Sequence, residues 1–169
     1  MKRFLHCLLL AGLLTSLPAP AQIRTAADID ARAFVIGLDA YVYGNGPLTW
    51  TADGRSFRAE ASGNSVILPA ATLSFDTADL LLGIHDFTGD QTPELIVGEK
   101  LPDGVKAHVL RWKEGAWKEI GAPALAGGTE CRIFRQALTI KDSATGVLHT
   151  WTWHGDRFDY KSSDNGVSF

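Results

Sequence analysis

The segment "ELIVGEKLPDGVKAHVLRWKEGAWKEIG", residues 94–121, decides the fold that the sequence predicts. Its apolar stretches are about four to eight residues long and rich in β-branched and aromatic residues, as in strands rather than helices. The turn sequence "PDG" at 102–104 and the glycine at 115 separate these stretches. The segment therefore predicts short strands that tight turns join in antiparallel order.

The same pattern extends along the chain on both sides of this segment. Further strand-like stretches are "SVILPA" at 65–70, "CRIFRQALTI" at 131–140 and "VLHTWTW" at 147–153. Turn sequences lie at 44–47, 52–54, 62–64 and 154–156. The stretch "TAADIDARAF" at 25–34 suits a helix, because Thr25 can cap it and Asp28 lies in its first turn. We therefore predict a mainly β fold: a single compact antiparallel β domain over residues 22–169, propeller-like or sandwich-like, with at most one or two short helices.

Three aromatic–glycine–aromatic units repeat along the sequence. They are Trp50, Gly54 and Phe57; Trp112, Gly115 and Trp117; and Trp151, Gly155 and Phe158. In each unit the glycine suits the positive φ of a tight hairpin turn, and we expect the two flanking rings to pair across the hairpin. The alternative is an aromatic platform on which a sugar ring or a partner side chain stacks.

The first 21 residues have the layout of a secretory signal peptide. Lys2 and Arg3 form a cationic head, an apolar stretch runs from 4 to 17, and the small residues Ala19 and Ala21 follow. The apolar stretch is too short for a membrane span, and no later stretch reaches about 18 uninterrupted apolar residues. We therefore expect cleavage after Ala21, a periplasmic or secreted location, and no membrane span in the mature chain.

Composition narrows the class of partner. Cleavage after Ala21 would leave 148 of the 169 residues, with 14 Lys and Arg against 19 Asp and Glu, a net charge of −5. No cluster of Lys and Arg occurs, so we expect no nucleic-acid binding. Cys131 would be the one remaining cysteine, so no internal disulfide can form, and "ECRIF" predicts a strand with a half-buried thiol.

Oxygen-bearing side chains recur at every second position after residue 85. In "HDFTGDQTPELIVGE", which begins there, positions 1, 3, 5, 7 and 9 of a loop are Asp86, Thr88, Asp90, Thr92 and Glu94. Calcium takes six to eight oxygen ligands, and a curled loop presents side chains from alternate positions plus a backbone carbonyl. Three neighbouring carboxylates also repel one another unless a cation neutralises them. The segment therefore predicts a calcium site formed by three carboxylates, the Thr88 hydroxyl and the Thr92 carbonyl.

This loop resembles the calcium loop of FG-GAP and VCBS-type repeats, the integrin-like propeller blades whose loops run roughly D-x-[DN]-x-D-G-x-x-D before an apolar strand. Asp86, Asp90 and Glu94 match the acidic positions, and the following "LIVG" matches the strand. Thr88 replaces the usual Asn or Asp, and Gln91 replaces the glycine that permits the sharp turn. The resemblance implies a structural calcium ion, and with these two departures we expect a Kd of about 10⁻⁵ to 10⁻³ M.

Two other interpretations of the loop remain open. The loop is a plain polar turn if Asp86 and Asp90 only accept hydrogen bonds from nearby backbone amides. It is catalytic if two carboxylates act across a cleft, for which Asp39 and Glu99 are further candidates. The sequence contains no HExxH, CxxC, GxSxG or phosphate-binding glycine loop, and Cys131 as a nucleophile is the remaining enzymatic hypothesis.

In its loop, its size and its export signal, the chain also resembles small periplasmic inhibitors and immunity proteins with a propeller-like β domain. That resemblance implies a non-enzymatic binding protein whose partner is a protein, such as a cell-wall hydrolase or a toxin. The candidate contact loops are "LPDG" at 101–104 and "PALAGG" at 123–128, because a glycine-flanked loop tip can enter a concave active site. The alternative is a small periplasmic carbohydrate-binding protein or glycan hydrolase that uses the carboxylates of the acidic loop.

Overall fold

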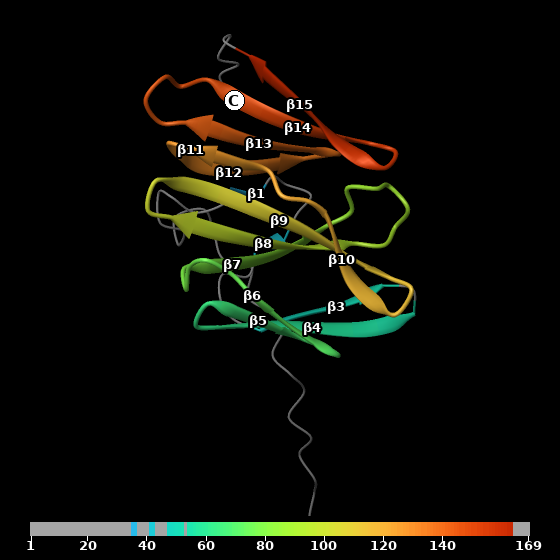
Figure 1. The fold of residues 1–169 in the computed structure, drawn as a ribbon. Coiled ribbons are helices and arrows are strands. Elements are labelled where there is room, and N and C mark those ends of the chain that lie inside the picture. The colour runs from blue at the N-terminus through green and yellow to red at the C-terminus, as the bar shows by residue number, and fades with distance from the viewer. Residues whose placement is uncertain (1–34, 37–40, 43–46, 53, 164–169) are drawn as a thin grey trace, which may run out of the picture.

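The described strands form three sheets, which we number in the chain order of their main strands (Figure 1). The computed structural model describes residues 35–36, 41–42, 47–52 and 54–163. The first sheet has the spatial order β3 (Leu48–Ala52), β4 (Arg55–Ser62), β5 (Ser65–Leu68) and β6 (Ala71–Ser74). The second has the order β10 (Ala116–Gly121), β9 (Gly104–Lys113), β8 (Glu94–Leu101), β7 (Leu80–His85) and β2 (Tyr41–Val42), and β11 (Ala124–Ala126) also pairs with β9. The third has the order β1 (Val35–Ile36), β12 (Gly128–Phe134), β13 (Ala137–Asp142), β14 (Leu148–His154) and β15 (Arg157–Ser163).

Each sheet is built on an antiparallel meander of four consecutive strands, with β1 and β2 added at the edges of the third and second sheets. The mainly β fold is confirmed, and β1 with β12 is the one parallel pair among the described strands. The helix predicted at 25–34, the signal peptide predicted at 1–21 and most of the turn predicted at 44–47 lie outside the described residues. Within the described ranges, no helix is long and apolar enough to cross a membrane.

The three sheets lie one above another as layers, with the second sheet in the middle (Figure 1). Leu95 and Val97 of β8 belong to the core between the first and second sheets, whereas Ile96 belongs to the core between the second and third sheets. Because β8 is buried on both faces, its residues 95–98 are a continuous apolar run rather than an alternating one. The second sheet therefore supplies one face to each of two hydrophobic cores.

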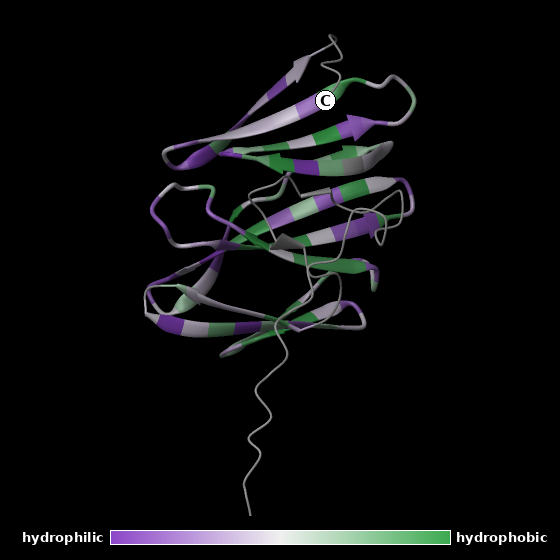
Figure 2. Cartoon of the chain, turned by 180° about the vertical axis from the view of Figure 1, so that it is seen from behind, coloured by the Kyte–Doolittle hydropathy of each residue, from purple (hydrophilic) through white to green (hydrophobic). Residues whose placement is uncertain are grey.

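The first sheet turns one of its faces to solvent. In β3 buried and exposed residues alternate strictly, with Leu48, Trp50 and Ala52 in the core and Thr49 and Thr51 exposed. Figure 2 shows the corresponding alternation of hydrophobic and hydrophilic residues along the strands. A polar outward face is what an outer layer of such a stack requires.

Two of the three predicted aromatic hairpins form in the expected register. Trp50 lies opposite Phe57 across the β3–β4 hairpin, with ring centroids 5.5 Å apart. Trp112 lies opposite Trp117 across the β9–β10 hairpin, with centroids 5.4 Å apart, and Gly115 in the turn has a φ of 81°. The four rings also contact one another between the first and second sheets, so they form core packing rather than an exposed platform.

The third aromatic pair differs from the prediction. Trp151 lies opposite Tyr160 instead of Phe158. The reason is the place of the glycine, because Gly155 is the first of its two turn residues, whereas Gly115 is the second in its own turn. Moving a two-residue turn by one position along the chain shifts every cross-strand pair by two positions.

Two other segments form secondary structure that differs from the prediction. The stretch 131–140 forms two strands, β12 and β13, which turn at Arg135 and Gln136, where Arg135 has a φ of 52°. The stretch 123–128 was predicted as a contact loop, and this is wrong for its middle, which forms β11. β10 pairs with β9 only as far back as Val109, so β11 takes up the edge of β9 that β10 leaves unpaired.

Candidate metal centre

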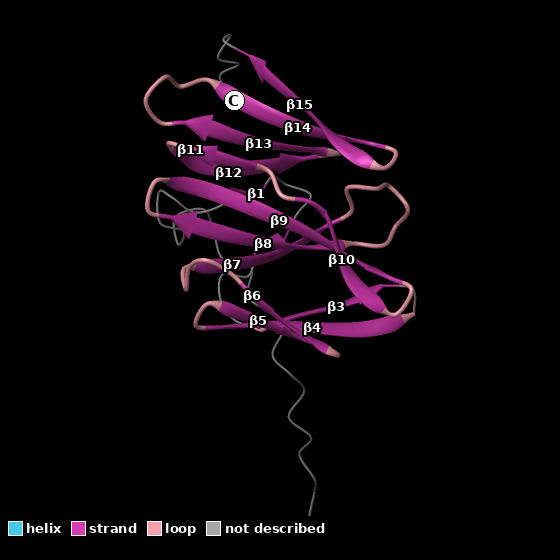
Figure 3. Ribbon diagram, viewed as in Figure 1, coloured by secondary structure: helices cyan, strands magenta, loops and turns pink. Residues whose placement is uncertain are grey.

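The connection between β7 and β8 carries the residues predicted to bind calcium. It runs from His85 to Glu94 and projects from one end of the second sheet (Figure 3). Phe87 anchors it, because this side chain is 0% exposed in the core between the second and third sheets, with its ring centroid 5.3 Å from that of Phe158. Phe87 was not among the predicted site residues, although an apolar residue inside a polar loop is a signal for such an anchor.

The structure brings the three carboxylates and the Thr88 hydroxyl together. One carboxylate oxygen from each of Asp86, Asp90 and Glu94 lies within 4.8 Å of the other two. Thr88 Oγ1 lies 3.0 Å from Asp90 Oδ1, 3.2 Å from Glu94 Oε1 and 3.4 Å from Asp86 Oδ1. Thr92 belongs to the same loop, and its amide donates a hydrogen bond to Asp90 Oδ1 over 3.0 Å. Four of the five predicted ligand groups therefore surround one point.

Backbone amides hold the carboxylates of this acidic loop in place. Both oxygens of Asp86 accept hydrogen bonds, Oδ1 from the Gly89 amide over 2.7 Å and Oδ2 from the Gln91 amide over 2.8 Å. Glu94 Oε2 accepts a hydrogen bond from the Phe87 amide over 2.8 Å. A plain polar turn would also use bonds of this kind, so they fit both interpretations of the loop.

Gln91 lies at the sharp turn where the calcium loops of FG-GAP and VCBS-type repeats have glycine. Its φ is 67°, close to the 74° of Gly89 in the same loop. Residues that carry a side chain rarely adopt this left-handed backbone conformation, and a residue other than glycine is strained there by about 1 to 3 kcal/mol. The departure at position 91 therefore strains the turn without preventing it.

Arg111 of β9 reaches the acidic loop, and the sequence did not predict this contact. Its guanidinium contacts the Asp90 carboxylate, and its Nε lies 3.9 Å from Glu94 Oε1. Three ionised carboxylates beside one guanidinium leave a net charge of −2, which a divalent cation would balance. Arg111 lies 21 positions after Asp90, and the pairing of β8 with β9 brings the two together.

The surroundings shift the pKa values of two carboxyl groups in opposite directions. Burial raises the pKa of Glu94 to about 7, although backbone and side-chain hydrogen bonds and the charge of Arg111 act against the shift. For Asp90, burial is outweighed by hydrogen bonds from the Thr92 amide and neighbouring side chains and by the charge of Arg111, so its pKa lies below the usual value. A bound divalent cation would favour the ionised form of Glu94 as well.

The other candidate residues do not join this cluster. The Nε2 atom of His85 contacts the backbone carbonyl oxygen of Arg135. Cys131 is 1% exposed, so the prediction of a half-buried thiol is wrong, because β12 turns this residue into the core between the second and third sheets. Glu99 is hydrogen-bonded to a histidine on the neighbouring strand, and Asp39 lies outside the described residues.

The predicted contact loops lie at the opposite end of the sheets from the acidic loop (Figure 1). Pro102 and Asp103 form an exposed turn between β8 and β9. The Gly127 amide donates a hydrogen bond to the Asp103 carbonyl over 2.6 Å, and Ser143 donates to the Gly127 carbonyl from both its amide and its hydroxyl. These exposed turns form what we call the hairpin tip, residues 102–103, 127 and 143–145.

The acidic loop is the one cluster of three metal-binding side chains within the described residues. Its oxygen donors, its charge and the turn at Gln91 fit calcium. The contact between Arg111 and Asp90 opposes this fit, since the guanidinium already neutralises part of the charge. Comparisons with protein-family models, with curated proteins and with solved structures find no match for this chain.

Proposed function

We propose that the protein is an exported, non-enzymatic binding protein with a calcium-stabilised β scaffold, acting as an inhibitor or immunity protein against a cell-wall hydrolase or a toxin. The convergence of Asp86, Asp90 and Glu94 around the Thr88 hydroxyl supports the calcium part of the proposal. We assign the Thr92 carbonyl as the remaining ligand. The resemblance in size and export signal supports a protein partner. The exposed hairpin tip is the surface we assign to that partner.

The ion would act on structure rather than on chemistry. Phe87 fixes the acidic loop to the core between the second and third sheets, and Arg111 joins it to β9. A calcium ion there would replace repulsion among the carboxylates by attraction. At a free calcium concentration about ten times the Kd, binding would stabilise the fold by about 1.4 kcal/mol.

A glycan hydrolase that uses the same carboxyl groups is the second candidate. The raised pKa of Glu94 beside the lowered pKa of Asp90 is the pattern of a general acid next to an ionised carboxylate. However, Glu94 is 0% exposed, so a substrate oxygen cannot reach its carboxyl group. The geometry therefore supports the calcium ion better than catalysis.

Thermal unfolding in EDTA, followed by excess calcium, tests the calcium part. We expect EDTA to lower Tm by about 3 to 8 °C and calcium to restore it. Asp90→Ala should abolish the response, because it removes a ligand. Asp156→Ala, which removes an exposed carboxylate from the β14–β15 turn, should keep it. A Tm that does not respond to calcium would exclude the ion from the proposal.

Hydrolysis of peptidoglycan by a periplasmic extract tests the partner part. The purified protein should lower the rate of hydrolysis in a saturable manner, and Asp103→Lys in the hairpin tip should relieve the inhibition while the calcium response of Tm remains. An unchanged rate would contradict an inhibitor of cell-wall hydrolases. Release of soluble sugar by the purified protein alone, lost in Glu94→Gln, would support the hydrolase instead.

A further inference from the structure

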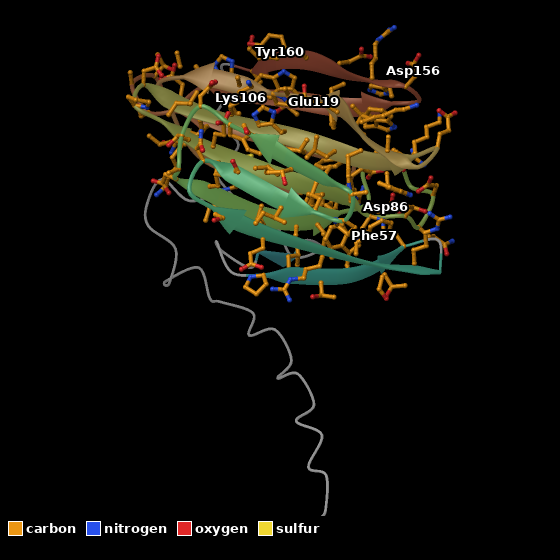
Figure 4. The ribbon with its side chains drawn as sticks, turned by 60° about the horizontal axis from the view of Figure 1, so that its bottom comes forward. Phe57, Asp86, Lys106, Glu119, Asp156 and Tyr160 are labelled. Atoms are coloured by element: carbon orange, nitrogen blue, oxygen red, sulfur yellow. The ribbon has the colours of Figure 1, made fainter. Side chains whose placement is uncertain are left out.

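A second group of charged residues lines a cleft between the first and second sheets. The cleft has a volume of about 420 Å³, within the range of small-molecule sites. One wall comes from β6 and the residues that follow it, and the other comes from β8, β9 and β10. In Figure 4, Lys106 and Glu119 of this cleft lie near each other and apart from Asp86 of the acidic loop.

His108 lines the cleft between two glutamates. Its Nε2 lies 2.8 Å from Glu99 Oε2, and its Nδ1 lies 2.6 Å from Glu119 Oε2. Glu99 is buried and also accepts a hydrogen bond from the Asp76 amide over 2.7 Å. This chain of bonds joins β8, β9 and β10 and fixes the Glu119 carboxylate at the wall of the cleft.

Two charged side chains of the cleft have no partner among the described residues. The Lys106 ammonium makes no ion pair or hydrogen bond there, and neither does the Asp76 carboxylate. By contrast, Lys118 on β10 is paired with Glu114 over 2.6 Å. The cleft thus presents an unpaired cation and an unpaired anion, together with the carboxylate of Glu119.

Aromatic side chains supply the apolar part of the cleft. The Phe75 ring contacts the imidazole of His108 edge-on, with centroids 5.0 Å apart. Trp117 lines the same cleft. The two rings give the cleft an apolar surface on which a ligand side chain can pack.

We propose that this cleft binds a small zwitterion of the class of apolar amino acids and dipeptides. The ligand carboxylate contacts Lys106, its ammonium contacts Asp76 and Glu119, and its side chain packs on Phe75 and Trp117. A simple cation is disfavoured because Lys106 would repel it, and a simple anion because the two carboxylates would. No residue of this cleft belongs to the acidic loop, so the site goes beyond the function proposed above and does not depend on calcium.

The probe is the dipeptide alanyl-phenylalanine, titrated into the purified protein by isothermal titration calorimetry. We expect saturable binding at one site. The C-terminal amide and the N-acetyl form each lack one charge, and each should bind about tenfold more weakly. All of these titrations use the wild-type protein. Absence of saturable binding, or equal binding of the three compounds, would overturn the proposal.

Lys106→Gln tests the contact with the ligand carboxylate. It should weaken binding of the dipeptide about tenfold and leave the already weak binding of the C-terminal amide unchanged. Lys118→Gln is the matched control, because it removes an ammonium of the same sheet that is already paired with Glu114. Equal losses in the two variants, or the same loss for dipeptide and amide in Lys106→Gln, would overturn the role of Lys106.

Discussion

Gln91 carries the backbone strain of the acidic loop, with a φ of 67°. Gln91→Gly should relieve about 1 to 3 kcal/mol of strain but adds about 0.5 to 1 kcal/mol of unfolded-chain entropy, so we expect a net gain of about 1 kcal/mol. Gln91→Ala removes the side chain and keeps the strained turn, so it should bring no gain. Urea unfolding in EDTA measures both variants. Equal gains would assign the effect to the glutamine side chain rather than to the turn.

Glu94 makes the stability of the calcium-free protein depend on pH. Its folded pKa of about 7 lies above the ordinary value of 4.5, so the fold favours the protonated carboxyl group. This contribution is fully present below about pH 4.5 and is lost as the pH rises through about 7, by at most about 3 kcal/mol. Urea unfolding in EDTA should therefore give a smaller free energy of unfolding near pH 8 than near pH 5.

Two comparisons isolate this effect of Glu94. Glu94→Gln should flatten the difference between the two pH values, because the amide does not titrate. Excess calcium should oppose the loss at high pH in the wild-type protein, because the ion binds the ionised carboxylate. If the same difference persists in Glu94→Gln, other groups cause the pH dependence.

Among the elements, local patterns predicted the strands more reliably than their registers and partners. The stretches that became β8 and β9 were recognisable from their apolar content and the turn between them. The register of Trp151 was missed because Gly155 and Asp156 both suit a turn, and the turn can lie one position earlier or later. The contact of Arg111 with the acidic loop was missed because it depends on which strands become neighbours, and no local pattern shows this.

β11 lies against β9 with no room for a side chain at Gly104. A Cβ atom there would lie 2.2 Å from the carbonyl oxygen of Leu125, a backbone atom that cannot rotate away. Gly104→Ala should detach β11 from β9 and lower the free energy of unfolding by about 1 to 3 kcal/mol. Hydrogen exchange should then be faster for the amides of β11.

Gly63→Ala is the control for the predicted effect of Gly104→Ala on β11. At Gly63 only the positive φ of 57° opposes a side chain, since no atom of the described residues lies within 4 Å of the added Cβ. Gly63→Ala should lower the free energy of unfolding by about 1 kcal/mol and leave the hydrogen exchange of β11 unchanged. Unchanged protection of β11 in Gly104→Ala would mean that β11 stays paired with β9, and it would contradict the steric argument.

At the scale of the whole molecule, the sequence did not predict how many sheets stack on one another. Propeller-like and sandwich-like arrangements both bury alternating residues of their strands, so alternation alone cannot distinguish them. The continuous apolar run of β8 is the local sign of a sheet that is covered on both sides. It places β8 in a middle layer, but the sheets that cover it come from segments far away in the sequence.

The shared second sheet should make the two cores one cooperative unit. Leu95 and Ile96 are adjacent in β8 but face different cores, so the loss of either core exposes one face of this strand. Leu48→Ala lies in the core between the first and second sheets, and Ile140→Ala lies in the core between the second and third. Each should lower the free energy of one and the same unfolding transition by about 2 to 5 kcal/mol. Tryptophan fluorescence and far-UV circular dichroism should give coincident transitions for each variant. Two separate transitions, each sensitive to one of the substitutions, would show that the layers unfold independently.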